Sequence, residues 1–240
     1  MSGKLSHVEP GGPALTVPLS DQVSMTKISV GPMDNNAYLL LPSAGGAVLI
    51  DAADDDQRLL EMIDGRQVSV IITTHRHGDH WQALPAVAEA TGADLVCGRP
   101  DIDAIATGAW VEGLVGAWDG DVVTLGDGEL EVIGLVGHTP GSIALAFTGS
   151  DGIVHLFSGD SLFPGGPGRT TSQEDFRSLV DDLEAKIFER FDDRTVVHPG
   201  HGDGTTLGAE RPHLADWRGG RGLPPRAPPR GAPAAPRGRV

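Results

Sequence analysis

The order of apolar and polar positions predicts many short strands and a few amphipathic helices. Runs rich in Val, Ile and Leu between Gly, Pro, Asn and Asp are typical of strands, and apolar residues three or four apart are typical of helices. Strands are predicted at residues 23–30, 37–41, 47–51, 68–73, 94–97, 121–125, 129–135, 143–147, 153–157 and 195–198. Helices are predicted at residues 54–63, 82–90, 101–106 and 172–188. This order predicts two sheets packed face to face with helices outside.

The chain length and an uneven composition divide the sequence into three parts. At 240 residues the chain is long enough for one domain with a substantial core. We assign that domain to residues 23–217 and treat residues 1–22 as an N-terminal extension. Of the 23 residues after Trp217, 21 are Arg, Gly, Pro or Ala without a periodic apolar face. We therefore expect residues 218–240 to be a disordered tail.

The composition narrows the class of function. A hydrophobic content of 39% and a mean hydropathy of -0.10 fit a soluble globular protein, and no apolar run is long enough to cross a bilayer. Residues 1–210 carry 11 Lys and Arg against 32 Asp and Glu, and such an acidic body disfavours nucleic acid. The single Cys97 and the lack of a signal-like segment in residues 1–21 predict a cytoplasmic protein. We expect a small-molecule substrate, and the oligomeric state stays open.

A cluster of histidines follows the predicted strand 68–73. Three of the chain's nine histidines lie within six positions, in the run Thr-His-Arg-His-Gly-Asp-His. The cluster contains His75, His77, Asp79 and His80. Imidazole and carboxylate suit a zinc-like or iron-like cation, and alternate residues of an extended loop can converge on one ion. The cluster therefore predicts a metal site at the end of this strand.

Three further predicted strands end in His or Asp beside glycine. His138 follows strand 129–135, Asp160 follows strand 153–157, and His201 follows strand 195–198. Glycine lets the backbone turn sharply close to an ion. Each residue alone is weak evidence, but together with the histidine cluster they form a candidate ligand set. Asp51 is a candidate to orient the ligands from behind, with a plain strand-end role as the alternative. His198 is a second candidate for this orienting role, but for His198 we favour a structural role.

The candidate ligand set resembles that of the metallo-β-lactamase superfamily of metal-dependent hydrolases, over residues 23–203. The resemblance implies an α+β fold, a four-layer αβ/βα sandwich of two mixed sheets with helices outside. It implies two divalent metal ions, zinc or alternatively iron. The implied ligands are His75, His77 and His138 for the first ion, Asp79, His80 and His201 for the second, and Asp160 as the bridge. His80 and the bridging Asp160 resemble the glyoxalase II, lactonase and ribonuclease Z branches, whereas the β-lactamases often depart from this set.

The resemblance also implies a mechanism. A bound cation lowers the pKa of water from about 15.7 toward 7, which makes a bridging hydroxide available at neutral pH. We expect Asp79 to orient that hydroxide and to accept its proton, and we expect the substrate to be a small thioester or an ester or lactone. Glyoxalase II enzymes recognise glutathione partly through a helical C-terminal domain. No such domain follows His201 here, so a glutathione thioester is not carried over.

Other functions are compatible with the same residues. A mononuclear iron persulfide dioxygenase would bind iron through His75, His138 and Asp160. A metal-stabilised binding module without turnover is a third hypothesis, and a nuclease is a fourth that the acidic body disfavours. The complete set of ligands for a second ion favours the dinuclear hydrolase.

Overall fold

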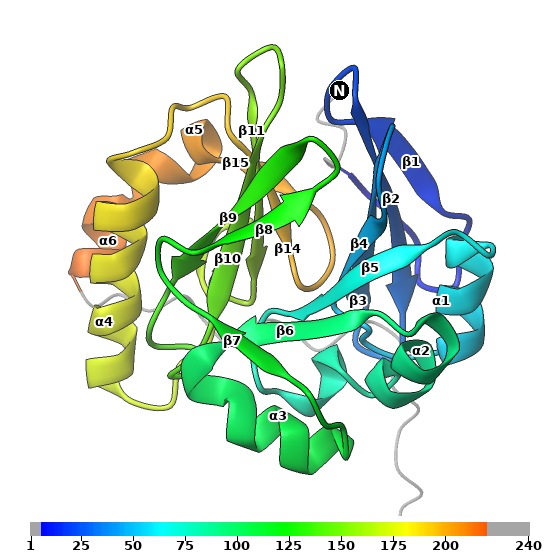
Figure 1. The fold of residues 1–240 in the computed structure, drawn as a ribbon. Coiled ribbons are helices and arrows are strands. Elements are labelled where there is room, and N and C mark those ends of the chain that lie inside the picture. Colours follow the sequence, from blue (N-terminus) through cyan, green and yellow to red (C-terminus); the bar gives the residue numbers. More distant parts are fainter. Residues whose placement is uncertain (1–5, 220–240) are drawn as a thin grey trace, which may run out of the picture.

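The computed structural model describes residues 6–219 and contains two mixed sheets packed face to face (Figure 1). The first sheet has seven strands in chain order: β1 (Leu15–Pro18), β2 (Val23–Val30), β3 (Asn35–Pro42), β4 (Ala47–Ile50), β5 (Val68–Thr73), β6 (Asp94–Gly98) and β7 (Val115–Ala117). The second sheet has the order β15-β14-β11-β10-β9-β8: β8 (Val122–Leu125), β9 (Gly128–Gly134), β10 (Ile143–Thr148), β11 (Val154–Gly159), β14 (Val196–Pro199) and β15 (Thr205–Thr206). A short separate ladder pairs β12 (Leu162–Phe163) with β13 (Gly166–Pro167).

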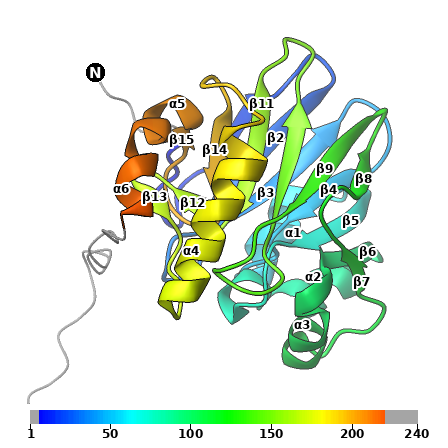
Figure 2. The same ribbon diagram turned by 90° about the vertical axis from the view of Figure 1, so that its left-hand side faces the viewer.

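Helices cover the outer face of each sheet, as the two views show (Figures 1 and 2). On the first sheet these are α1 (Asp56–Ile63), α2 (Leu84–Thr91) and α3 (Ile102–Ala109). On the second sheet these are α4 (Gln173–Asp182), α5 (Leu207–Glu210) and α6 (Leu214–Arg218). A π-helix at Leu183–Phe188 continues α4, and 3-10 turns lie at Gly78–His80, Arg99–Asp101 and Arg211–His213. Within residues 6–219, no helix combines the length and apolar character needed to cross a membrane.

Three clusters of buried apolar side chains separate the four layers. Leu59 and Val87 belong to the cluster between the first sheet and its helices. Phe157 belongs to the cluster between the two sheets. Leu179 and Trp217 belong to the cluster between the second sheet and its helices. The predicted four-layer αβ/βα sandwich is confirmed, because each face that the sequence pattern made apolar is covered by another layer.

The elements that the sequence pattern did not predict are the shortest ones. β7, β12, β13, β15, α5 and α6 have between two and five residues, which is too short for a periodic pattern to show. β1 lies within residues 1–22, which the sequence analysis set apart, and pairs with β2 as the edge of the first sheet. Its last residue, Pro18, is tolerated because an edge strand has one unpaired side. The predicted tail lies outside the described residues, apart from Arg218 and Gly219.

Parallel pairing and contacts between the sheets bring the strand ends to one edge of the sandwich. β5 is parallel to both β4 and β6, and β11 is parallel to β14. The two sheets meet where the N–H of Ile143 donates to the carbonyl of Thr74 (2.9 Å). They meet again where the N–H of Asn36 donates to the carbonyl of Gly200 (2.8 Å). Loops from both sheets therefore share this edge.

Candidate metal centre

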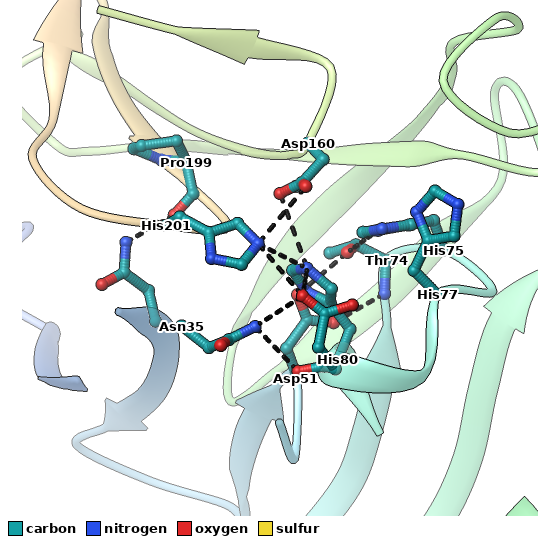
Figure 3. A network of polar contacts seen from close by, with 12 residues as sticks. Asn35, Asp51, Thr74, His75, His77, His80, Asp160, Pro199 and His201 are labelled. Carbon is teal, nitrogen blue, oxygen red and sulfur yellow. Dashed lines mark hydrogen bonds and ion pairs between the residues drawn. The ribbon is translucent and has the colours of Figure 1, made fainter. Parts of the chain in front are cut away.

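All seven predicted ligands lie together at this edge. Figure 3 shows five of them, His75, His77, His80, Asp160 and His201, gathered in one place. The seven ligands are carried by the loop after β5, the 3-10 turn Gly78–His80, the β9–β10 loop, the end of β11 and the loop after β14. They form three overlapping groups of three, and the group of His75, His80 and Asp160 shares one histidine with each of the other two. We call His75, His77 and His138 the first group, and Asp79, His80 and His201 the second group.

The first group consists of three imidazoles. The Nδ1 atom of His77 lies 2.9 Å from Nε2 of His138, and Nε2 of His75 lies 3.2 Å from the same atom. An ion with tetrahedral bonds of about 2.0–2.1 Å separates its ligand atoms by about 3.3 Å. The spacing of the three nitrogens therefore fits a single ion.

The second group contains one carboxylate and two imidazoles. The Nε2 atoms of His80 and His201 lie 3.1 Å apart. The Oδ2 atom of Asp79 lies 3.4 Å from Nε2 of His201 and 3.7 Å from Nε2 of His80. These distances are close to the separation of about 3.3 Å expected between the ligand atoms of a tetrahedral ion, so the second group also fits one ion.

Asp160 lies between the two groups. Its Oδ2 atom is 3.6 Å from Nε2 of His138 and 3.4 Å from Nε2 of His201, and its Oδ1 atom is 3.5 Å from Nε2 of His80. The Oδ1 atom is buried without a hydrogen-bond partner. A Cβ atom on Gly200 would lie 2.3 Å from this oxygen, so the loop after β14 can approach so closely only with glycine there. A buried carboxylate whose Oδ2 atom faces both groups suits a bridging ligand.

Four of the histidines are held from behind, through the ring nitrogen that faces away from the centre. Each Nδ1 atom faces an acceptor: Thr74 Oγ1 for His75 (3.1 Å), Asp51 Oδ2 for His80 (2.9 Å), the Arg169 carbonyl for His138 (2.6 Å) and the Met33 carbonyl for His201 (3.0 Å). Because Nδ1 donates its hydrogen outward, Nε2 of each ring carries the lone pair when the ring is neutral, and it faces the centre. Lone pairs that face one another at these distances repel unless a cation lies between them. The donor set therefore fits bound metal ions.

Charge in the second group favours a cation at the same place. Burial opposes a charge on His201, but hydrogen bonds with Asp160 and Asp79 outweigh it and raise the pKa of His201 to about 10. Burial also opposes a charge on His80, but the nearby carboxylates of Asp160 and Asp51 outweigh it and raise the pKa of His80. The pKa values of Asp79 and Asp160 are lowered, because the histidines outweigh the effect of burial. A proton on a histidine and a metal ion are thus alternative partners for the same carboxylates.

The first group has the opposite electrostatics. Burial lowers the pKa of His75 well below its usual value, and the neighbouring His80 lowers it further. Burial and the neighbouring His138 also lower the pKa of His77. Both rings are therefore neutral at pH 7, with lone pairs available for a metal ion.

Asp51 lies directly behind the histidine cluster. Its carboxylate accepts hydrogen bonds from the N–H of Thr74 (2.8 Å), from the Thr74 hydroxyl (2.9 Å) and from Nδ1 of His80 (2.9 Å). Its backbone has a φ of 58°, in the left-handed region that a residue with a side chain rarely adopts. This strained conformation lies at the end of β4 and directs the carboxylate under the loop after β5.

His198 has a different environment from Asp51. Its Nε2 atom lies 3.2 Å from Nδ1 of His155, and its ring stacks on Phe157 with 4.9 Å between centroids. It is 2% exposed. Within the described residues, its contacts are with the core and not with the seven ligands.

Two residues that the sequence analysis did not single out contact the ligand loops. The Nδ2 atom of Asn35 donates to Oδ2 of Asp79 (3.0 Å) and to the Asp79 carbonyl (2.8 Å). Asp101 is fully buried and accepts from the N–H of Arg76, between His75 and His77. In the sequence Asn35 has the pattern of a turn residue and Asp101 that of a helix start, so neither position carried a signal of its own.

The sandwich and its converging imidazoles and carboxylates define a metal-dependent hydrolase. The model of the metallo-beta-lactamase superfamily matches residues 30–205. The chain belongs to this superfamily.

Relatives with curated names support a particular branch. Hydroxyacylglutathione hydrolase GloC of Haemophilus influenzae is 28% identical over 210 residues, which cover 77% of this chain and 93% of GloC. A hydroxyacylglutathione hydrolase of Anaeromyxobacter dehalogenans is 36% identical over 176 residues, which cover 70% of this chain and 61% of that protein. The chain thus matches nearly all of GloC but less than two thirds of the second relative.

Solved structures share the fold. ETHE1 from Myxococcus xanthus has a TM-score of 0.66 at 27% identity, over 81% of this chain and 84% of that one. TTHA1623, solved in a di-iron-bound form, has a TM-score of 0.60 at 32% identity, over 77% of this chain and 96% of that one.

Proposed function

We propose that the protein is a dinuclear metal hydrolase that cleaves a small thioester or an ester or lactone. The observation that carries this proposal is the position of Asp160, with one carboxylate oxygen toward the first group and both oxygens toward the second. Two relatives are named as hydrolases of hydroxyacylglutathione, which is an acylated thiol, and this supports the substrate class.

The first group would hold one ion and the second group the other, with Asp160 shared. When bound, the two ions supply a water of lowered pKa and polarise a substrate carbonyl. Zinc is the metal we propose, because imidazole and carboxylate in tetrahedral spacing suit it, and iron is the alternative. A cytoplasmic location and a small-molecule substrate rather than nucleic acid belong to the same proposal.

Asp79 is the proposed catalytic base. Its carboxylate is ionised at neutral pH and can accept a hydrogen bond from the attacking water, although its lowered pKa makes it a weaker base than a free carboxylate. The amide of Asn35 holds the Oδ2 atom of Asp79 (3.0 Å) and thereby fixes its direction. Asp79 would then carry the proton of the water toward the leaving group.

The substrate can include glutathione thioesters. This widens the substrate class expected from the sequence, which left glutathione thioesters out. GloC matches this chain over 93% of its own length and is named hydroxyacylglutathione hydrolase, so a chain of this size is compatible with such a substrate. The proposal therefore specifies an activated acyl group in the substrate and no particular leaving thiol or alcohol.

The test is metal analysis of the purified protein followed by a substrate panel. We expect about two zinc ions per chain and chelator-sensitive cleavage of at least one member of a panel of glutathione thioesters, other small thioesters and lactones. The Asp79→Asn variant should lose turnover at least as strongly as it loses metal. Near-native turnover in Asp79→Asn would refute the base assignment, and a metal-loaded protein inactive on the whole panel would refute the hydrolase.

A mononuclear iron persulfide dioxygenase is the second candidate. The observation that favours it is that Nε2 of His138 lies within 3.2 Å of His75 Nε2 and 3.6 Å of Asp160 Oδ2, so these three residues can surround a single ion. About one iron per chain, with oxygen uptake on a persulfide, would replace the hydrolase by this function.

A further inference from the structure

We propose that Asp101 is a positioning residue that sets the geometry of the first group and thereby its affinity for a metal ion. The inference rests on the proposed function, since it concerns one of the two proposed metal positions. Asp101 belongs to the 3-10 turn Arg99–Asp101 after β6 and contributes no ligand atom to either group.

The Asp101 carboxylate joins the two loops that carry the first group. Its Oδ2 atom accepts from the N–H of Arg76 (3.0 Å) and from the hydroxyl of Thr139 (2.6 Å). Its Oδ1 atom accepts from the N–H of Gly141 (3.1 Å). Arg76 stands between His75 and His77, and Thr139 follows His138 directly. One buried carboxylate thus connects the chain beside all three ligands of this group.

The hydrogen bonds around Asp101 run in one direction. Two of its partners are backbone N–H groups, which can only donate, so the carboxylate accepts from every partner. The Thr139 hydroxyl must then donate to Asp101, and the hydroxyl of Ser142 in turn donates to Thr139 Oγ1 (2.8 Å). The N–H of Thr139 donates to Ser142 Oγ (3.1 Å) and closes the network. A buried carboxylate that accepts from three donors fixes the two loops relative to each other.

The two loops approach each other closely around the Asp101 carboxylate. A Cβ atom added to Gly141 would lie 2.5 Å from the backbone nitrogen of Asp101 and 2.6 Å from its Cγ. A Cβ atom on Gly98 would lie 1.8 Å from the Gly141 carbonyl oxygen. The turn with Asp101 comes from the first sheet and the loop with Thr139 from the second, so the carboxylate locks the two sheets together beside the first group.

Asp51 and Asp101 divide the histidine cluster between them. Asp51 holds Thr74 and His80, whereas Asp101 holds the peptide N–H of Arg76 and the loop of His138. Within the described residues, no hydrogen bond joins Asp101 to a member of the second group. Removing its charge should therefore affect the two groups unequally.

The experiment measures the zinc dissociation constant of each group separately, by competition with a chromophoric chelator. The His201→Ala protein keeps the first group intact, and the His77→Ala protein keeps the second. Adding Asp101→Asn to His201→Ala should weaken zinc binding by about 10–100-fold, the usual effect of a lost outer-sphere partner. The asparagine amide nitrogen would face the N–H of either Arg76 or Gly141, which are both donors. The loop that carries that N–H therefore loses its hydrogen-bond acceptor. Adding Asp101→Asn to His77→Ala should leave zinc binding unchanged.

The control is Asp103→Asn, which removes an exposed carboxylate two residues further along the same segment and should change neither constant. Thr139→Val should weaken the first group in the same direction, and Thr139→Ser, which keeps the hydroxyl, should restore it. These two variants decide the matter if Asp101→Asn does not fold. Unchanged binding in the His201→Ala background, or equal losses in both backgrounds, would overturn the inference. A wild-type protein that binds no ion in the second group would instead contradict the dinuclear function, while the His201→Ala series would still decide the role of Asp101.

Discussion

The two halves of the candidate metal centre are built on different principles. The first group is three imidazoles, with His77 exposed and with His75 and His77 kept neutral by lowered pKa values. The second group pairs Asp79 with His80 and His201, and the pKa of each of these histidines is raised. Neutral lone pairs bind a cation without first releasing a proton, whereas the second group must exchange one. Two adjacent groups with similar ligand spacing can therefore differ in how strongly their metal affinity depends on pH.

Asp160 is the residue that joins the two halves, so its loss should have the largest effect. Asp160→Ala removes a carboxylate that faces both groups, and we expect both ions to bind weakly. With the loss of about 4 kcal/mol of transition-state stabilisation, kcat/KM should fall by about 10³-fold or more. Metal content and kcat/KM are measured on the same preparation, and circular dichroism serves as the folding control. Retention of two ions would contradict the bridging position.

Substitution of one ligand from each half should separate the two positions. His77→Ala should leave the protein with about one ion, held by the second group, and His201→Ala should leave about one ion, held by the first. Each variant should lose about 100-fold in kcat, because the remaining ion keeps only part of the charge stabilisation. Metal analysis after dialysis gives the stoichiometry. If either variant lost both ions, the two positions would not be independent.

Proton release should distinguish the halves without any activity assay. At pH 8 zinc binding by the second group should release about one proton or more, since His201 has a pKa of about 10 and must give up its proton. Its affinity should rise with pH until about pH 10. Zinc binding by the first group should release almost none. Calorimetry of His77→Ala and His201→Ala in buffers of different ionisation enthalpy measures both values, and equal release from the two variants would remove the proposed contrast.

Lys27, which contacts the loop of His201, gives the smallest expected effect and tests whether a buried charge beside the second group is destabilising. It is fully buried on β2, and its Nζ donates to the carbonyls of Gly202 (2.6 Å) and Ser6 (2.8 Å). Burial lowers its pKa from 10.5 to about 8, more than Asp34 and Asp203 raise it. Below pH 8 the folded state carries the buried charge, and above pH 10.5 neither state is charged, so this penalty disappears as pH rises through that window.

In the wild type the titration of Lys27 should raise the free energy of unfolding by about 2–3 kcal/mol between pH 8 and pH 10.5. In Lys27→Met this increase should be absent. Urea unfolding of metal-free wild type and variant at several pH values measures it, because titrations common to both proteins cancel in the difference. Parallel pH profiles would show that the Lys27 charge is not destabilising.

The regular elements and the ligands were the predictable part of this protein. The run Val68–Thr73 is a short β-branched segment, and it forms β5 with the same bounds. Ser172 accepts from the N–H of Asp175 (3.0 Å) and caps the helix that the sequence predicts to begin there. The predicted helix 172–188 changes to a π-helix at Leu183, which its apolar spacing did not reveal. Local sequence patterns specify where a helix or strand forms, but they do not specify a change of hydrogen-bond type within a helix.

What the sequence by itself determined is the candidate set of seven ligands, since imidazole and carboxylate groups recur beside glycine at the ends of several predicted strands. What only the tertiary structure decided is how those ligands are held. Asn35 is 44 positions from Asp79, and Asp101 is 38 positions from Thr139. Such partners are ordinary turn or helix-start residues in the sequence, because their role depends on which loops the packing of the two sheets brings together.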